Sequence, residues 1–172
     1  HLRESSTVVH WLCLILALPT SNAAERMRAW RALKAAGAAV LRDGVYLLPD
    51  QPACRESMSR VERDILGGEG YACVLPVCDP QGERFVSLFS RASEYASLRA
   101  EADAQLIQVT PETALSLTRQ ARKLRKAYAQ LTEIDFFPDA AQQQADAKLR
   151  ELELAISRAL SRDEPSSQAQ AL

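Results

Sequence analysis

Residues 21–50 read SNAAERMRAWRALKAAGAAVLRDGVYLLPD, and the local signals in this stretch predict one helix followed directly by a tight hairpin. Asn22 and Glu25 have the spacing of a capping box, in which a side-chain acceptor satisfies an orphan N–H and the glutamate reaches back. Gly37 can adopt the left-handed conformation that ends a helix. Apolar residues at helical spacing define the face that we expect to pack against a sheet: Ala23, Met27, Trp30 and Leu33.

The hairpin is predicted from two short apolar runs, 38–41 and 45–48, that flank Arg42-Asp43-Gly44. Asp-Gly between strands is a strong hairpin signal, because both residues tolerate the positive φ of the turn. We therefore expect two antiparallel strands directly after the helix.

Further apolar runs complete the first half of the chain. The run 8–18 is too short to cross a membrane, which takes about 20 apolar residues, and its length is that of a buried central strand. A helix capped by Asp50 and a strand over 71–78 follow. Pro76 predicts an edge position for that strand, since proline cannot donate to the ladder. The order strand–helix–strand–strand–helix–strand predicts an α+β, ferredoxin-like βαββαβ domain over residues 7–78.

The second half predicts a helical region over residues 79–160, packed on or beside the first domain. One helix is expected over 79–106, and two heptad-spaced helices lie on either side of a break at 135–138. Because the break is short, these two helices are expected to pack as an antiparallel hairpin. The polar residues 161–172 predict a disordered tail.

The composition excludes a generally cationic protein. With 172 residues, 47% of them hydrophobic, the chain can bury a core. Its formal net charge is −1, so any affinity for nucleic acid must come from local basic clusters. The cysteines lack the spacing of a zinc site or of a disulfide framework, which predicts reduced thiols and a cytoplasmic protein: Cys13, Cys54, Cys73 and Cys78.

The most concentrated charge is a run of five cations in eight residues, with no acid among them: Arg119, Arg122, Lys123, Arg125 and Lys126. On a helix, Arg119, Arg122 and Lys126 share a face, while Lys123 and Arg125 flank the apolar stripe. A nucleic-acid backbone could then meet several donors at once. The alternative is a solvated face that pairs with acids of the neighbouring helix, such as Glu151 and Glu153.

A second basic group surrounds the first helix and the hairpin, diluted by Glu25 and Asp43: Arg26, Arg28, Arg31, Lys34 and Arg42. A basic helix beside a hairpin can contact phosphates, and simple solvation is an equal alternative. If this group binds DNA, we expect Arg28, Arg31 and Arg42 to make the contacts.

The sequence argues against catalysis and predicts neither a metal ion nor a cofactor. Divalent-metal phosphoryl chemistry needs carboxylates at a strand end, whereas the first strand ends in LALPT. A hairpin turn explains Asp43, and a helix cap explains Asp50. The histidines are His1, at the start of the chain, and His10, within the first strand. No glycine-rich phosphate loop opens a helix.

Three segments carry a family resemblance. They are TVVHWLCLILALPTSNAAERMRAWRALKAAGAAVLRDGVYLLPD at 7–50, FVSLFSRASEY at 85–95 and IDFFP at 134–138. These segments look like the N-terminal domain of the chromate-resistance regulator ChrB, and the resemblance covers residues 8–160. The block RMRAWRALKAAGAAVLRDGVYLLP is its most specific part. The N-terminal part of that family is also similar to the middle domain of the PaaX regulators and to the Cas2 fold.

The resemblance implies a cytosolic, chromate-responsive transcriptional regulator encoded beside a chromate efflux transporter. Full-length members carry a further C-terminal domain with histidine- and cysteine-containing segments, to which oxyanion sensing is usually attributed. This chain ends before that domain. We therefore expect operator binding or homodimerisation here, and chromate as an effector that the absent domain senses.

The sequence is compatible with two main classes of function and with a third that it favours less. The first is a DNA-binding module that regulates a chromate-resistance operon in a stress response, with operator DNA and a second copy as partners and no membrane contact. The second is an interaction module that dimerises through the sheet face or edge and leaves DNA contact to other parts. A metal-dependent nuclease like Cas2 is the third. Binding to phosphates should weaken steeply with salt, whereas a hydrophobic dimer should not.

Overall fold

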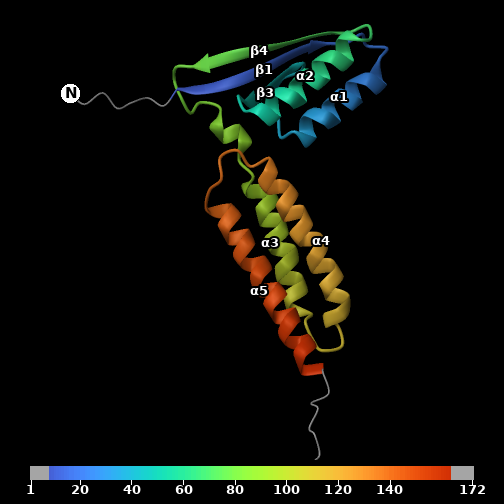
Figure 1. The fold of residues 1–172 in the computed structure, drawn as a ribbon, viewed down its shortest axis with the longest axis vertical. Helices are drawn as coiled ribbons and strands as arrows, with labels where there is room; N and C mark the ends of the chain where they lie inside the picture. Colours follow the sequence, from blue (N-terminus) through green and yellow to red (C-terminus); the bar gives the residue numbers. More distant parts are fainter. Residues whose placement is uncertain (1–7, 164–172) are drawn as a thin grey trace, which may run out of the picture. The chain divides into compact units, whose positions relative to one another are not determined.

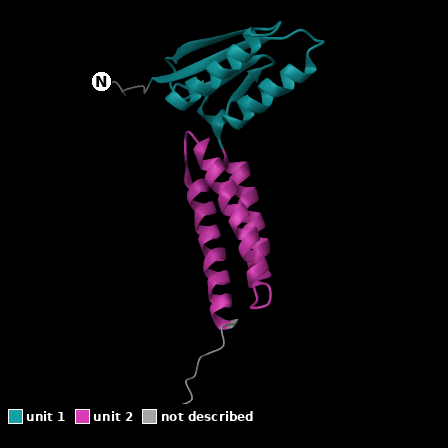
Figure 2. Ribbon diagram, turned by 45° about the vertical axis from the view of Figure 1, so that its right-hand side comes forward, with its two compact units in different colours: residues 1–90 teal, residues 91–172 magenta. Residues whose placement is uncertain are grey.

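The computed structural model describes residues 8–163, and the chain divides into two compact units, residues 1–90 and 91–172 (Figure 2). The first unit combines a four-stranded sheet with helices, and the second contains helices, so the expected mixed α and β class is confirmed. The elements of the first unit are β1 (Val9–Ala17), α1 (Ala23–Ala35), β2 (Ala39–Arg42), β3 (Val45–Pro49), α2 (Pro52–Leu66), β4 (Tyr71–Asp79) and the 3-10 helix η1 (Val86–Phe89).

The sheet has the strand order β2-β3-β1-β4, and every neighbouring pair is antiparallel. β1 lies between β3 and β4, as expected for the apolar run 8–18, and its Trp11, Leu12 and Leu14 are buried. β4 lies at an edge, as Pro76 predicts. Helices α1 and α2 lie along one face of the sheet (Figure 1).

Helix α1 begins and ends where the sequence predicts. The backbone N–H of Glu25 donates to Asn22 Oδ1 at 3.4 Å. The Glu25 carboxylate accepts from the side-chain amide of Asn22, and the backbone N–H of Asn22 instead donates to the Pro19 carbonyl at 3.0 Å. Gly37 follows the helix with φ 84°, the left-handed conformation expected for it.

The expected buried face of α1 is wrong at three of its four positions. Leu33 is buried as expected, whereas Ala23 is exposed and Met27 and Trp30 are 45% and 39% exposed. The other buried residue of the helix is Ala29. Each residue turns a helix by roughly 100°, so the pair 29 and 33 points one way and Trp30 lies on the flank. There the ammonium of Lys34 lies 4.8 Å from the centre of the indole ring.

The hairpin joins β2 and β3 with a bulge. Gly44 has φ 78°, but no residue of the described chain other than glycine has a positive φ, so Asp43 does not adopt the conformation that we expected of it. The pairing shifts register between Val40 and Arg42, because the strand absorbs one extra residue there.

Asp50 does not cap α2. The N-cap position is Gln51, and Pro52 occupies the first turn as expected. The carboxylate of Asp50 instead accepts a hydrogen bond from Arg55 Nε at 2.6 Å.

The expected helix over 79–106 is divided. Asp79 ends β4, η1 forms a short turn, and α3 (Ala92–Ile107) begins only after it. Phe89 stacks on Trp11 with ring centres 5.3 Å apart, and Phe85 meets the same indole edge-on at 6.1 Å. These rings hold the chain against β1, so the first unit extends beyond the expected boundary at residue 78.

The second unit contains α3, α4 (Ala114–Glu133) and α5 (Ala140–Asp163). Helices α4 and α5 pack antiparallel as expected, and α3 completes the bundle (Figure 1). Residues 161–163, expected in the tail, are helical, while 164–172 and residue 7 lie outside the described part. No helix within 8–163 is long and apolar enough to cross a membrane. The bundle core is Ala102, Ala114, Leu117, Ala121, Leu124, Leu149, Leu152, Ile156 and Ala159.

Candidate nucleic-acid interface

Helix α4 carries four exposed cations on one face: Arg119, Arg122, Lys123 and Lys126. At roughly 100° per residue, these positions fall within an arc of about 100°, directly opposite the buried stripe. That stripe contains Leu117, Ala121 and Leu124, which pack in the bundle core. Lys123 therefore shares the exposed face, instead of flanking the stripe as we expected.

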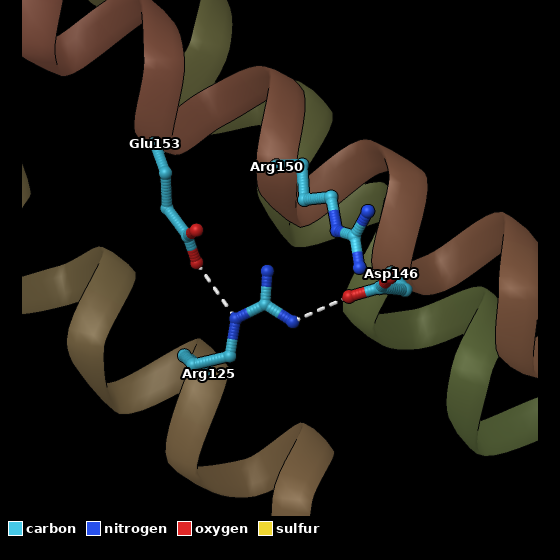
Figure 3. A network of polar contacts seen from close by, with 4 residues as sticks. All are labelled: Arg125, Asp146, Arg150 and Glu153. Atoms are coloured by element: carbon cyan, nitrogen blue, oxygen red, sulfur yellow. Dashed lines mark hydrogen bonds and ion pairs between the residues drawn. The ribbon is translucent and has the colours of Figure 1, made fainter.

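Arg125, the remaining cation of the run, belongs instead to a network of ion pairs between α4 and α5 (Figure 3). Its Nη1 atom lies 2.6 Å from Asp146 Oδ1, and its Nε atom lies 2.7 Å from Glu153 Oε1. Arg150 also binds the Asp146 carboxylate, at 2.9 Å. The hydrogen bond to Glu153 raises the pKa of Arg125 against the effect of partial burial, and the bond to Asp146 raises it further. Arg125 is thus a cross-link between α4 and α5.

The four cations of the exposed face remain available for a ligand. Among residues 8–163, no ion pair involves any of them. The acids that could have neutralised them are engaged elsewhere, since Glu153 binds Arg125 and Glu151 binds Lys148 at 2.9 Å. The expected pairing with α5 therefore applies to Arg125 alone.

The charge of this face is uniform along the helix. The only acidic residue of α4 is Glu133, which is its last residue. Arg119 and Lys126 are seven positions apart, so the cations extend over about 10 Å of the helix axis. We call Arg119, Arg122, Lys123 and Lys126 the α4 basic face.

The second basic group is divided between α1 and β2. Arg28, Arg31 and Arg42 are all exposed. Arg28 lines a hollow between α1 and α2 together with two acids, Glu25 and Asp64. Arg42 lies on β2, and Arg31 lies on the solvent side of α1. Arg28 and Arg31 are thus neighbours on α1 and Arg42 lies on another element, whereas the four cations of the α4 basic face lie on one helix.

Two features beside the basic face were missed by the sequence reasoning. One is Asp146, the acid that shares Arg125 with Glu153. Aligning the apolar stripes of α4 and α5 as an antiparallel pair would have placed it there. The other is a hollow of about 450 Å³ between the two helices, whose lining includes Arg122, Arg125 and Ile156. No sequence signal shows that the helices leave this space.

In the described part of the chain, the residues considered for catalysis lie on different elements and do not form a common site. Asp43 is at the hairpin turn, Asp50 pairs with Arg55, and His10 is exposed on β1. Within residues 8–163, no group of three or more His, Cys, Asp and Glu side chains is placed to hold a metal ion. His1 lies outside the described residues.

Comparison with known proteins identifies the family. Residues 26–161, which include most of α1 and all of α4, match the family model described as "Protein ChrB, N-terminal". The chain belongs to the ChrB family. The resemblance drawn from the sequence is thereby confirmed.

A curated relative agrees with this assignment. The protein ChrB of Cupriavidus metallidurans is 35% identical over 164 residues, which cover 94% of this chain and 51% of the relative. The chain therefore spans about half the length of this ChrB relative. No solved structure matches the chain.

Proposed function

We propose that this chain is a DNA-binding part of a chromate-resistance regulator, and that the α4 basic face contacts the phosphates of operator DNA. The observation that carries the proposal is the set of four exposed cations without ion pairs on one arc of α4. Membership of the ChrB family supports the regulatory role.

The chemistry of this face suits a phosphate backbone. Lys and Arg that neutralise phosphates release condensed counterions, which provides affinity without base recognition. The cations extend over about 10 Å, and duplex DNA carries one charge per about 1.7 Å of its axis, so several phosphates lie within reach. The packed stripe on the opposite side of α4 holds the helix in the bundle, so the face is presented by a folded support.

The remaining parts of the proposal follow from the fold and the family. The element order βαββαβ and the strand order β2-β3-β1-β4 support a ferredoxin-like first unit, related to the PaaX middle domain and to Cas2. We assign the protein to the cytoplasm and assign it no enzymatic activity, since Asp43 is exposed at the hairpin turn and Asp50 is paired with Arg55. We place chromate sensing in the part of the ChrB relative that this chain does not match.

The test is equilibrium binding of the chain to a labelled duplex from the promoter of its own operon, measured by anisotropy over a range of salt concentrations. An unrelated duplex of equal length measures the non-specific component. We expect log affinity to fall with log salt with a slope of about −0.9 per phosphate contacted, hence roughly −3 to −4 for this face. A chain without salt-dependent affinity for either duplex would reject the proposal and leave the interaction-module alternative.

A further inference from the structure

Within the first unit, the two α-helices lie along the same face of the sheet (Figures 1 and 2). Val40 and Tyr46 line a hollow with Trp30 of α1, so they point toward the helices. Tyr46 is paired with Leu14, which therefore points the same way. Successive side chains of a strand point to opposite faces, so Cys13 and Ile15 of β1 point away from the helices. Their partners on β4, Leu75 and Cys73, point the same way.

The opposite face is apolar and partly open. Phe89 covers it at Trp11 and Leu47, paired with Cys13, is buried as well. The large side chains of β1 and β4 on this face are more exposed: 59% for Tyr71, 43% for Leu75, and 38% for both Ile15 and Val77. Apolar area that is left exposed in a contiguous patch marks an interaction surface. We call the following set the apolar sheet face: Cys13, Ile15, Tyr71, Cys73, Leu75 and Val77.

The edge of β4 is closed to strand pairing. The backbone N–H of Val74 points outward and donates to the Glu62 carboxylate at 2.7 Å. Pro76, two residues on, points the same way and has no N–H to donate. A partner strand would have to displace Glu62 and would meet a missing donor beside it. A partner that binds at β4 must therefore approach the face of the sheet.

We propose that the apolar sheet face binds the same face of a second copy of this chain, sheet against sheet. None of its six residues is charged, so two copies meet without like-charge repulsion, and such a face is complementary to itself. Neither β1 nor β4 contains Lys or Arg, so the face offers no attraction for an anionic lipid surface. This inference does not rest on DNA binding and goes beyond it.

The cysteines provide an internal reporter of this contact. Cys13 and Cys73 lie on the apolar sheet face, whereas Cys78 is exposed and paired with His10, whose side chain points to the helix side. Burial, with a smaller contribution from Cys73, raises the pKa of the Cys13 thiol, so Cys13 reacts slowly in the monomer too. Each thiol is therefore compared with itself at different protein concentrations.

Sedimentation velocity tests the proposal on the full chain, with two variants that place an acid on an edge strand. Leu75→Asp puts the charge in the proposed contact. Val40→Asp is the matched control, because Val40 is 53% exposed on β2 and faces the helices. We expect the wild type and Val40→Asp to sediment with twice the chain mass and Leu75→Asp with the mass of one chain. Circular dichroism establishes that all three are folded.

Alkylation of the wild type gives a second readout that needs no variant. We expect the alkylation rate of Cys73 to fall at least several-fold between dilute and concentrated protein, while the rate of Cys78 stays constant. A wild type that sediments as one chain at its highest soluble concentration would overturn the proposal. So would a dimer that persists in Leu75→Asp, or a Cys73 rate that does not change as the dimer forms. Vesicles of zwitterionic lipid that capture the chain and dissociate the dimer would assign the face to a membrane instead.

Discussion

Arg125 on α4 lies 2.6 Å from Asp146 on α5, and this contact separates the function of Arg125 from that of its neighbours in sequence. Five cations follow one another closely along the chain, but of these five only Arg125 is bound by carboxylates of α5. The other four point to solvent. The run therefore contains one structural residue and a set of four available for binding.

Replacing Arg125 with Ala should destabilise the bundle. Its side chain is 33% exposed and makes two charge-assisted hydrogen bonds, so we expect the free energy of unfolding to fall by about 1–2 kcal/mol. Arg122→Ala, one turn away, should cost no more than about 0.5 kcal/mol. Urea denaturation of both variants provides the comparison. Equal costs would show that the network contributes nothing to stability.

Trp30→Ala should cost little, because the indole lies on the flank of α1. We expect less than about 1 kcal/mol for Trp30→Ala, against about 2–5 kcal/mol for Leu33→Ala, whose side chain is 1% exposed. Denaturant titrations of the two variants rank the residues. The opposite ranking would mean that α1 packs with the face that its apolar periodicity first suggested.

Tyr95 should make the chain sensitive to alkali. Burial raises the pKa of its phenol above 10.0, and its hydrogen bond to Asp135, 2.8 Å long, acts in the same direction. In the unfolded chain tyrosine ionises near pH 10, whereas the folded chain retains the proton. Stability is therefore full below about pH 10 and falls as the pH rises above it. Tyr95→Phe should lose about 1 kcal/mol at neutral pH and show a weaker decline in alkali, measured by urea denaturation at several pH values. An unchanged alkaline decline would assign it to other groups.

Asn22→Ala should destabilise α1 by about 0.5–2 kcal/mol, because an orphan N–H at the helix start loses its acceptor. Asn22→Ser retains an acceptor and should recover most of the loss. Thermal or urea unfolding of the two variants measures the difference. If serine and alanine cost the same, the cap is not the source of the stability.

Features that depend on residues close together in the sequence were predicted correctly. The Asn22 cap, the Gly37 terminator and the edge position of Pro76 follow from one or two residues and were all found. Trp30 was assigned to the wrong side, since the orientation of a helix depends on its partner surface. Phe89 was assigned to a long helix, because its stacking on Trp11 joins residues far apart in sequence.

The candidate site shows the same limit. The cation run and the apolar stripe of α4 were visible in the sequence, so the direction of most of the charges could be predicted. The role of Arg125 could not, because Asp146 reaches it only when α5 folds back. The position of Arg28 and Arg31 relative to Arg42 depends likewise on how α1 packs beside the hairpin.

The central claim, that the α4 basic face binds DNA, is tested most directly by the salt dependence of two variants of equal charge. One replaces Arg119, Arg122 and Lys126 with Ala, and the other replaces Arg28, Arg31 and Arg42. Each removes three positive charges from a chain of net charge −1, so each has net charge −4. We expect the α4 variant to flatten the log–log salt slope by about two to three while it remains folded, because each lost phosphate contact removes about one. We expect the slope of the other variant to change by less than about one. A folded α4 variant with the wild-type slope, beside a flattened slope in the other variant, would contradict the claim.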